Sequence, residues 1–150
     1  MLNLFRHHTY SDDEITISLS QQYGREPDVG IEKTYCFNIY LNDAAMRRIG
    51  YVDLRIGENE FLYYLGHIGY RIAEEYRGHH YAAKAVKLLL PFARKQKMRR
   101  LIITCNPDNI ASKKTIEYLN ADYLETVEVP SWHELYQRDE KRKCIYEIKL

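Results

Sequence analysis

The sequence predicts an α/β fold: a mixed, mostly antiparallel sheet of about seven strands flanked by helices. Alternating apolar and polar residues in the N-terminal half have the period of half-buried strands. Residues 82–97 then place Ala, Val and Leu at helical spacing, which makes one apolar stripe. A second strand and helix follow over residues 99–120, and two further strand patterns close the chain. The order of these segments places the helices against the sheet.

Four strands are predicted in the N-terminal half: Glu14–Leu19, Thr34–Leu41, Arg48–Ile56, and one bent at Gly66 that joins Glu60–Leu65 to His67–Ile72. Residues 1–13 are polar and irregular. Gln21–Lys33, with two glycines and a proline, is predicted to be a loop.

Three strands are predicted in the C-terminal half: Arg99–Cys105, Asp122–Val129 and Lys143–Leu150. The first has a continuous apolar centre, as expected of a central strand. Asn109 is suited to cap a helix from Ile110 to about Asn120. We expect the polar segment between the last two strands, residues 130–141, to be a loop near a substrate.

A tight connection, Arg77–Tyr81, joins the strand that ends at Ile72 to the long helix. A strand that runs through such a loop into a helix leaves unpaired backbone N–H groups at the positive end of the helix dipole. Phosphate groups bind well there, although many joints of this kind bind nothing.

Composition predicts a single domain, since 150 residues are enough for one core. The net charge of +1 indicates neither a nucleic-acid partner nor a polybasic membrane anchor. The N-terminal residues lack a signal peptide's apolar region, and no apolar run approaches a transmembrane length of about 20 residues. We therefore expect a cytoplasmic protein. A homodimer is left open.

The sequence gives little support to a metal site. Cys36, Cys105 and Cys144 are far apart, and they fit buried strand positions in a reducing compartment better than disulfides or a metal cluster. His7 and His8 are adjacent, so on a strand they point to opposite faces. We expect no metal.

Two motifs resemble the GNAT superfamily of N-acetyltransferases. Residues 77–82, Arg-Gly-His-His-Tyr-Ala, are similar to the family's Arg/Gln-x-x-Gly-x-Gly/Ala loop, with His80 where the family usually has Gly. Residues 102–112 look like the family's fifth strand and fourth helix, including the Asn-x-Ala-Ser helix start. Residues 66–126 are most similar to a small bacterial subgroup of predicted acetyltransferases. The resemblance implies the GNAT fold and acetyl-CoA as co-substrate.

The resemblance also implies site residues. Backbone of Ile72, Ala73 and Glu74 would hold the pantetheine arm in a gap beside the fourth strand. The pyrophosphate would bind N–H groups of Arg77, Gly78, His79, His80, Tyr81 and Ala82. Asn109 and Ser112 would contact the cofactor, although Ser112 also fits a plain hydroxyl of the first helical turn. The two histidines fit either phosphate contact or solvent exposure.

The sequence identifies the catalytic groups less clearly than the cofactor-binding residues. Glu74 is a candidate base, and so is its neighbour Glu75, although both also fit a solvated turn. The family's usual acid, a Tyr on the fourth helix, is Ile116 here, and Tyr118 lies roughly 200° around the helix from that position. Cys105 lies in an apolar strand with no base at motif spacing, so we expect a core residue and not a nucleophile.

Three functions are compatible with these features. The first is direct acetyl transfer from acetyl-CoA to a primary amine of a small molecule or peptide. The second is an acyl-CoA-binding regulatory module without transferase activity, which the missing Tyr favours. The third is a structural protein that kept the fold and lost the cofactor, for which His80 is the only support. The sequence does not identify the acceptor of the acetyl group.

Overall fold

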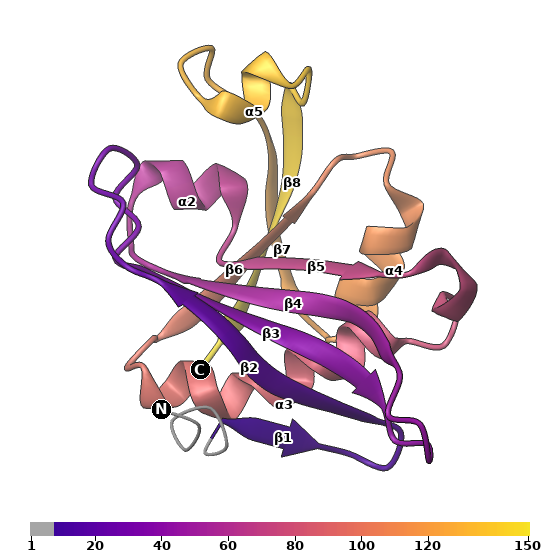
Figure 1. Ribbon diagram of the computed structural model, residues 1–150. Coiled ribbons are helices and arrows are strands. Elements are labelled where there is room, and N and C mark those ends of the chain that lie inside the picture. Colours follow the sequence, from indigo (N-terminus) through magenta and orange to yellow (C-terminus); the bar gives the residue numbers. More distant parts are fainter. Residues whose placement is uncertain (1–7) are drawn as a thin grey trace.

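The computed structural model describes residues 8–150, in which eight strands form two antiparallel sheets (Figure 1). The five-stranded sheet has the order β1-β2-β3-β4-β5: Thr9–Ser11, Ile15–Tyr23, Lys33–Leu41, Arg48–Ile56 and Ile68–Ile72. The three-stranded sheet has the order β6-β8-β7: Arg100–Cys105, Arg142–Lys149 and Asp122–Glu128. The helical elements are α2 Glu60–Leu65, η1 Glu74–Tyr76, α3 Tyr81–Lys95, α4 Ile110–Tyr118 and α5 Glu134–Gln137.

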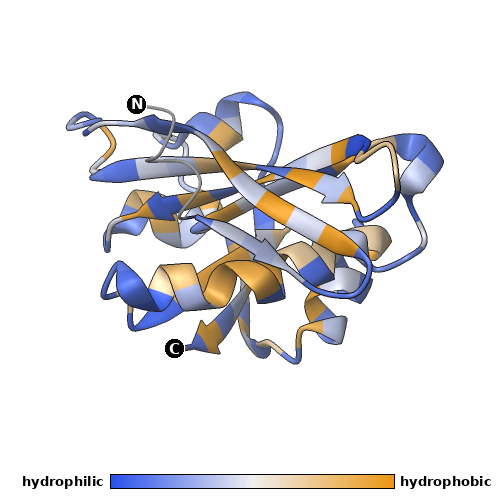
Figure 2. Ribbon diagram, turned by 60° about the horizontal axis from the view of Figure 1, so that its bottom comes forward, coloured by the Kyte–Doolittle hydropathy of each residue, from blue (hydrophilic) through white to orange (hydrophobic). Residues whose placement is uncertain are grey.

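The core lies between the five-stranded sheet and α3, which packs against β1, β2, β4 and β5. Figure 2 shows the hydrophobic and hydrophilic bands that alternate along the strands. Phe37 of β3 and Phe92 of α3 are buried and meet edge to face at 5.2 Å. The α/β class and the amphipathic helix predicted from the sequence are therefore confirmed. Within residues 8–150, no helix is long and apolar enough to cross a bilayer.

The two sheets meet at β5 and β6, which are joined at one end and separate towards the other. At the joined end, the backbone N–H of His67 donates to the carbonyl of Ile102 at 2.8 Å, and the N–H of Ile102 donates to Nδ1 of His67 at 2.8 Å. Beyond this point β5 pairs only with β4, and β6 pairs only with β8. We call the gap between β5 and β6 the split.

The prediction that Glu60–Leu65 is a strand is wrong, because these residues form α2. The side chain of Asn59 accepts a hydrogen bond from the N–H of Leu62 at 2.9 Å, which starts the helix. Gly66, at φ 86°, ends it, and its N–H donates to the carbonyl of Leu62. These end contacts, together with burial of Leu62, outweigh the β preference of the Phe and Tyr residues.

Three smaller differences concern the ends of elements. The short β1 lies in residues 1–13, the segment predicted as irregular, of which residues 1–7, with His7, lie outside the described residues. β2 continues to Tyr23 after a bulge between Leu19 and Gln21, into the predicted loop. The polar segment before β8 contains the short helix α5.

Candidate functional site

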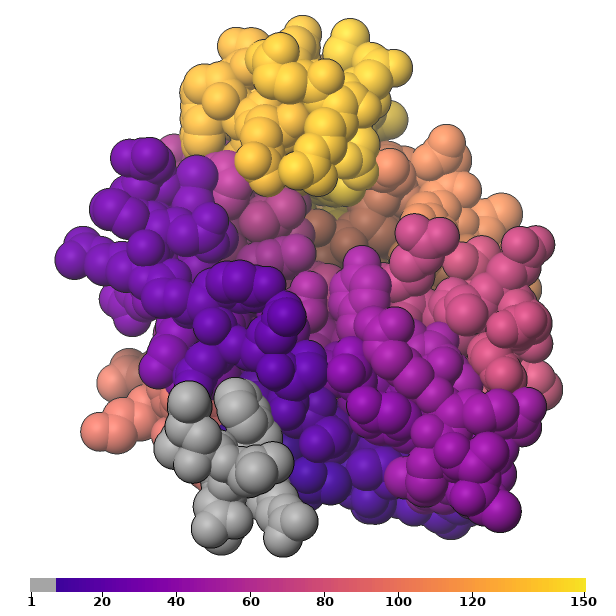
Figure 3. Space-filling model, viewed as in Figure 1, coloured from indigo at the N-terminus to yellow at the C-terminus, as the bar shows by residue number. Residues whose placement is uncertain are grey.

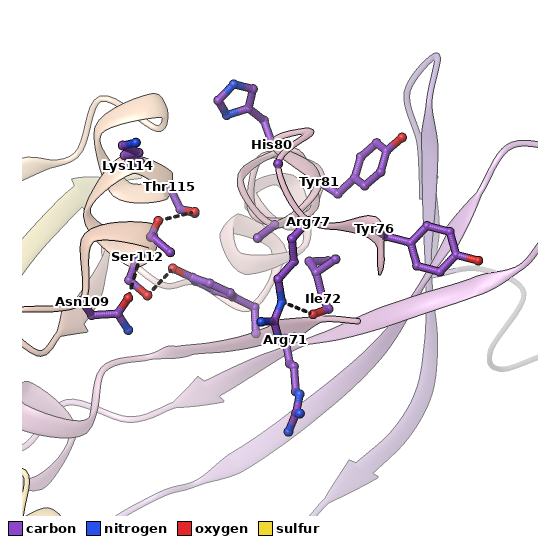
Figure 4. Close-up of a pocket in the computed structure, with 14 residues that line it drawn as sticks. Arg71, Ile72, Tyr76, Arg77, His80, Tyr81, Asn109, Ser112, Lys114 and Thr115 are labelled. Atoms are coloured by element: carbon purple, nitrogen blue, oxygen red, sulfur yellow. Dashed lines mark hydrogen bonds between the residues drawn. The ribbon is translucent and has the colours of Figure 1, made fainter. Parts of the chain in front are cut away.

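A cavity of about 580 Å³ lies at the open end of the split, where β5 leads into α3 (Figure 4). Its walls come from the end of β5, the loop that enters α3, and the first turns of α3 and α4. The lining residues are Tyr70, Arg71, Ile72, Tyr76, Arg77, Gly78, His80, Tyr81, Ala82, Asn109, Ala111, Ser112, Lys114 and Thr115.

The start of α3 has no side-chain cap, although the helix is 15 residues long. The structure gives no acceptor to the backbone N–H groups of Gly78, Tyr81 and Ala82 within the described part of the chain. The start of α4 differs, because the Asn109 side chain accepts from the N–H of Ser112 at 3.1 Å. Free N–H groups at a helix start, inside a cavity, make a site for an anion.

His80 adopts the left-handed conformation, with φ 63° and ψ 22°, just before α3. This conformation favours glycine, so the backbone here has the shape that the family's glycine would give it. The His80 ring stacks on Tyr118 of α4, with centroids 4.3 Å apart and planes 14° apart. The stack links the start of α3 to the C-terminal end of α4 and offsets part of the backbone strain.

Two substitutions at position 80 measure the ring stack on Tyr118 and the backbone strain separately. His80→Ala loses the stack but keeps the strained backbone, and we expect it to lower the free energy of unfolding by about 1 to 2 kcal/mol. His80→Gly loses the same stack and relieves the strain, so it should be about 1 kcal/mol more stable than His80→Ala. Urea unfolding of both variants tests this order, and equal stability would show that His80 is not strained.

The free edge of β5 lines one side of the cavity. Ala73 N–H donates to the carbonyl of Ile49 on β4 at 2.8 Å, so the backbone groups of Ile72, one residue earlier, point away from β4. The Ile72 carbonyl accepts from Nε of Arg77 at 2.8 Å. The Ala73 carbonyl accepts from Tyr76 N–H, so both backbone groups of Ala73 are already bonded.

The hydroxyl of Tyr70 crosses from β5 to α4 and meets Oγ of Ser112 at 3.4 Å. Burial raises the pKa of Tyr70, and the Ser112 contact offsets part of this effect. Tyr70 therefore stays protonated at neutral pH, inside the cavity. Figure 4 shows Arg71, the next residue, pointing away from the helices.

Most of the predicted cofactor residues come together in this cavity. Those that line it are Ile72, Arg77, Gly78, His80, Tyr81, Ala82, Asn109 and Ser112. Ala73, Glu74 and His79 are not among the lining residues, and Glu74 is exposed in η1. The roles of all eleven in cofactor binding stay predictions, and so does the role of Glu74 as a base.

Tyr70 and Thr115 line the cavity but were not predicted from the sequence. Helical spacing could have indicated Thr115, which lies three residues after Ser112 on one helix face. Tyr70 looked like an ordinary strand residue. Ile116, the family's usual acid position, is fully buried, and Tyr118 stacks on His80 and does not line the cavity.

Two of the three cysteines are buried. Cys105 and Cys144 are buried and face each other across β6 and β8, and burial raises the pKa of Cys105 to about 11. Cys105 is thus a core thiol, as the sequence predicted. No group of three or more His, Cys, Asp or Glu in residues 8–150 is placed to hold a metal ion.

The fold is that of an α/β protein whose two sheets separate beside an uncapped helix start. The family model of the acetyltransferase (GNAT) domain matches residues 3–121. The chain therefore belongs to the GNAT acetyltransferase family. No sequence among the curated proteins is similar enough to count as a match.

Solved structures share the fold at low sequence identity. Ribosomal-protein-S5-alanine acetyltransferase from Vibrio fischeri is 11% identical, with a TM-score of 0.67 over 94% of this chain and 96% of that one. RimL, a ribosomal L7/L12 alpha-N-protein acetyltransferase in complex with coenzyme A, is 18% identical, with a TM-score of 0.59 over 78% and 62%. Microcin C7 self-immunity acetyltransferase MccE, in complex with acetyl-CoA and AMP, is 13% identical, with a TM-score of 0.62 over 93% and 94%.

Proposed function

We propose that this acetyltransferase moves an acetyl group directly from acetyl-CoA to a primary amine. The observation that carries the proposal is the uncapped start of α3, which opens into a cavity at the split. The diphosphate of coenzyme A matches the free N–H groups of Gly78, Tyr81 and Ala82. Lys114, which also lines the cavity, adds a positive charge.

The edge of β5 is suited to the pantetheine arm. The N–H of Ile72 points into the split and has no acceptor among the described residues, so it can bind an amide carbonyl of the arm. The sequence also predicts that the backbone of Ala73 holds the pantetheine arm. This contact would require the backbone hydrogen bonds of Ala73 to Ile49 and Tyr76 to break. An arm on this edge would place the thioester deeper in the split, beside Tyr70.

The reaction forms one C–N bond and breaks one C–S bond. The neutral amine attacks the thioester carbonyl, the resulting tetrahedral centre collapses, and the thiolate leaves. The acceptor amine starts as an ammonium group and loses two protons, the first before it attacks and the second as the amide forms. Tyr70 is protonated and lies in the cavity, so it is suited to give the thiolate a proton and to take one from solvent afterwards.

Tyr70→Phe tests this role. We expect kcat to fall about tenfold, because the thiolate loses its proton donor. The Kd of acetyl-CoA should change by less than about twofold, because the ring remains. Stopped-flow or steady-state release of CoA measures kcat, and calorimetry measures Kd. An unchanged kcat would show that the thiolate leaves without help from Tyr70.

Two measurements test the proposed function itself. Isothermal titration with acetyl-CoA tests the cavity, and thiol release across primary amines tests transfer. Failure to bind acetyl-CoA would overturn the proposal. Binding without release of CoA for any amine would favour the regulatory module, for which the buried Ile116 in place of the usual acid is the supporting observation.

A further inference from the structure

The face of the five-stranded sheet opposite α3, which we call the open face, carries polar side chains. Helix α3 covers the other face, and Figure 3 shows the open face towards the viewer, with the lobe around α5 above it. Burial lowers the pKa of Arg55 of this face, and Glu134 of α5 is near enough to Arg55 to offset part of this shift. Strand register places Cys36, Asp53 and Gly69 in one row across β3, β4 and β5. The next row contains Tyr51 and Arg71.

Asp53 is a half-buried carboxylate without a strong partner. Its side-chain hydrogen bond is with the Cys36 thiol, which is a weak donor. Burial raises the pKa of Asp53, and Cys36 and Arg55 offset this only in part. Burial, with the negative charge of Asp53, raises the pKa of Cys36 to about 12, so the thiol keeps its proton. The structure shows no ion pair to Asp53 within residues 8–150. A half-buried carboxylate without an ion-pair partner is stabilised when a ligand brings a positive charge next to it.

Two arginines flank Asp53 on this face. Nη1 of Arg55 donates to the Gly66 carbonyl at 3.0 Å, and its Nη2 lies over Gly69, 2.8 Å from where a Cβ would be. Arg71 is exposed at the edge of the cavity, and its side chain has no hydrogen bond or ion pair to the described chain. Because Asp53 pairs with Gly69 and Tyr51 pairs with Arg71, Asp53 and Arg71 are diagonal neighbours, with Cα atoms roughly 7 to 8 Å apart.

The open face is also next to the split. Gly69 of the edge strand β5 lies between Asp53 and the split, and β4 and β5 are about 4.8 Å apart. Tyr70 points to the opposite side of β5, into the cavity. A ligand on Asp53 therefore approaches the split from the side opposite the cavity.

We propose that the acceptor binds on the open face, with its ammonium group at Asp53 and an anionic group of the same molecule at Arg71. This rests on the proposed acetyl transfer. The acceptor is then an amine that carries a carboxylate or a phosphate a few atoms away. Such a molecule satisfies the unpaired carboxylate and the unpaired guanidinium together.

Matched pairs of amines test the anionic group. With saturating acetyl-CoA, glycine is compared with glycinamide, and O-phosphoethanolamine with 2-methoxyethylamine, by release of CoA. We expect the anionic member of at least one pair to have a kcat/KM higher by about tenfold or more. The pair that shows it identifies carboxylate or phosphate. Arg71→Gln should remove the preference, whereas Arg142→Gln, an exposed arginine on β8, should leave it.

Asp53→Asn tests the ammonium contact. It keeps the shape of Asp53, and we expect kcat/KM for the preferred amine to fall about tenfold to a hundredfold. The Kd of acetyl-CoA should stay within about twofold, as it should for Asp13→Asn, an exposed control that should also keep its activity.

Three results would overturn this inference while leaving acetyl-CoA binding intact: equal rates within both pairs, full activity of Asp53→Asn, or no CoA release with any of the four amines. Loss of acetyl-CoA binding by the unmodified protein would overturn the proposed function as well.

Discussion

His80→Asp is expected to weaken acetyl-CoA binding by about a hundredfold or more while strengthening the start of α3. Asp is a preferred N-cap and tolerates the left-handed conformation that His80 adopts. Its carboxylate would accept from the free N–H groups of the first turn, which we propose for the diphosphate. A fixed negative charge would then also repel that ligand.

Asn and Ala at the same position separate the two effects. His80→Asn also caps the helix but is uncharged, so its acetyl-CoA affinity should lie between those of the parent and His80→Asp. His80→Ala gives no cap, and His80→Asp should exceed its unfolding free energy by about 1 kcal/mol. Calorimetry and urea unfolding measure the two quantities. Undiminished acetyl-CoA binding by His80→Asp would place the diphosphate away from α3.

The sequence predicted the elements around the cavity because local signals specify them. The apolar stripe of α3 and the Asn109 cap of α4 depend on residues within a turn or two of each other. Most of the predicted cofactor residues line one cavity because they lie at the end of β5, in the loops that enter these helices, or in the first turns of the helices.

The helix α2 shows where local signals fail. Its residues favour strands by composition, and the helix depends on the Asn59 cap and on Gly66 at its end. The side chain of Asn59 also donates to the Gly30 carbonyl at 2.6 Å, far away in the sequence. A contact of this kind has no sequence period, so pattern analysis did not reveal it.

The open face illustrates a second limit. Cys36, Asp53 and Gly69 each look like ordinary strand residues in the sequence, and only the register of three strands places them in one row. The polar partners of Asp53 therefore follow from tertiary structure. The same holds for Tyr70, whose hydroxyl finds Ser112 only after β5 and α4 have packed.

His67→Ala is expected to lower the free energy of unfolding by about 3 kcal/mol, and it should also weaken acetyl-CoA binding. His67 is buried at the joined end of the split. Its Nδ1 accepts from Ile102 N–H, so Nε2 carries the hydrogen and donates to the Gly57 carbonyl at 2.8 Å. Removing the ring leaves a cavity and two buried polar groups without partners, and only the backbone bond from His67 N–H to the Ile102 carbonyl still joins β5 to β6 here.

A second buried histidine supplies the matched control. His133 also uses both ring nitrogens: Nε2 contacts the Phe61 carbonyl at 3.0 Å, and Nδ1 accepts from Leu135 N–H at 3.0 Å. Both partners of His133 lie in α2 and α5, away from the cavity. His133→Ala should therefore lose stability to a similar extent and keep its acetyl-CoA affinity. Equal loss of affinity in both variants would mean that instability, and not the geometry of the split, weakens binding.

The pH dependence of stability gives an independent test of His67. Burial lowers its pKa in the folded protein, more than the Gly57 bond and Glu58 raise it, and Arg100 and Arg55 lower it further. The unfolded chain, with a histidine pKa of about 6.5, then binds more protons than the folded chain at slightly acid pH. The contribution of neutral, buried His67 to the free energy of unfolding is therefore fully present above about pH 6.5, and it is lost as the pH falls through the folded pKa.

His67→Asn retains an acceptor for Ile102 N–H but does not titrate. Urea unfolding between about pH 7.5 and 5 should therefore show a free energy of unfolding that depends less steeply on pH in this variant than in the parent. Equal slopes would show that His67 is not held neutral at the joined end of the split.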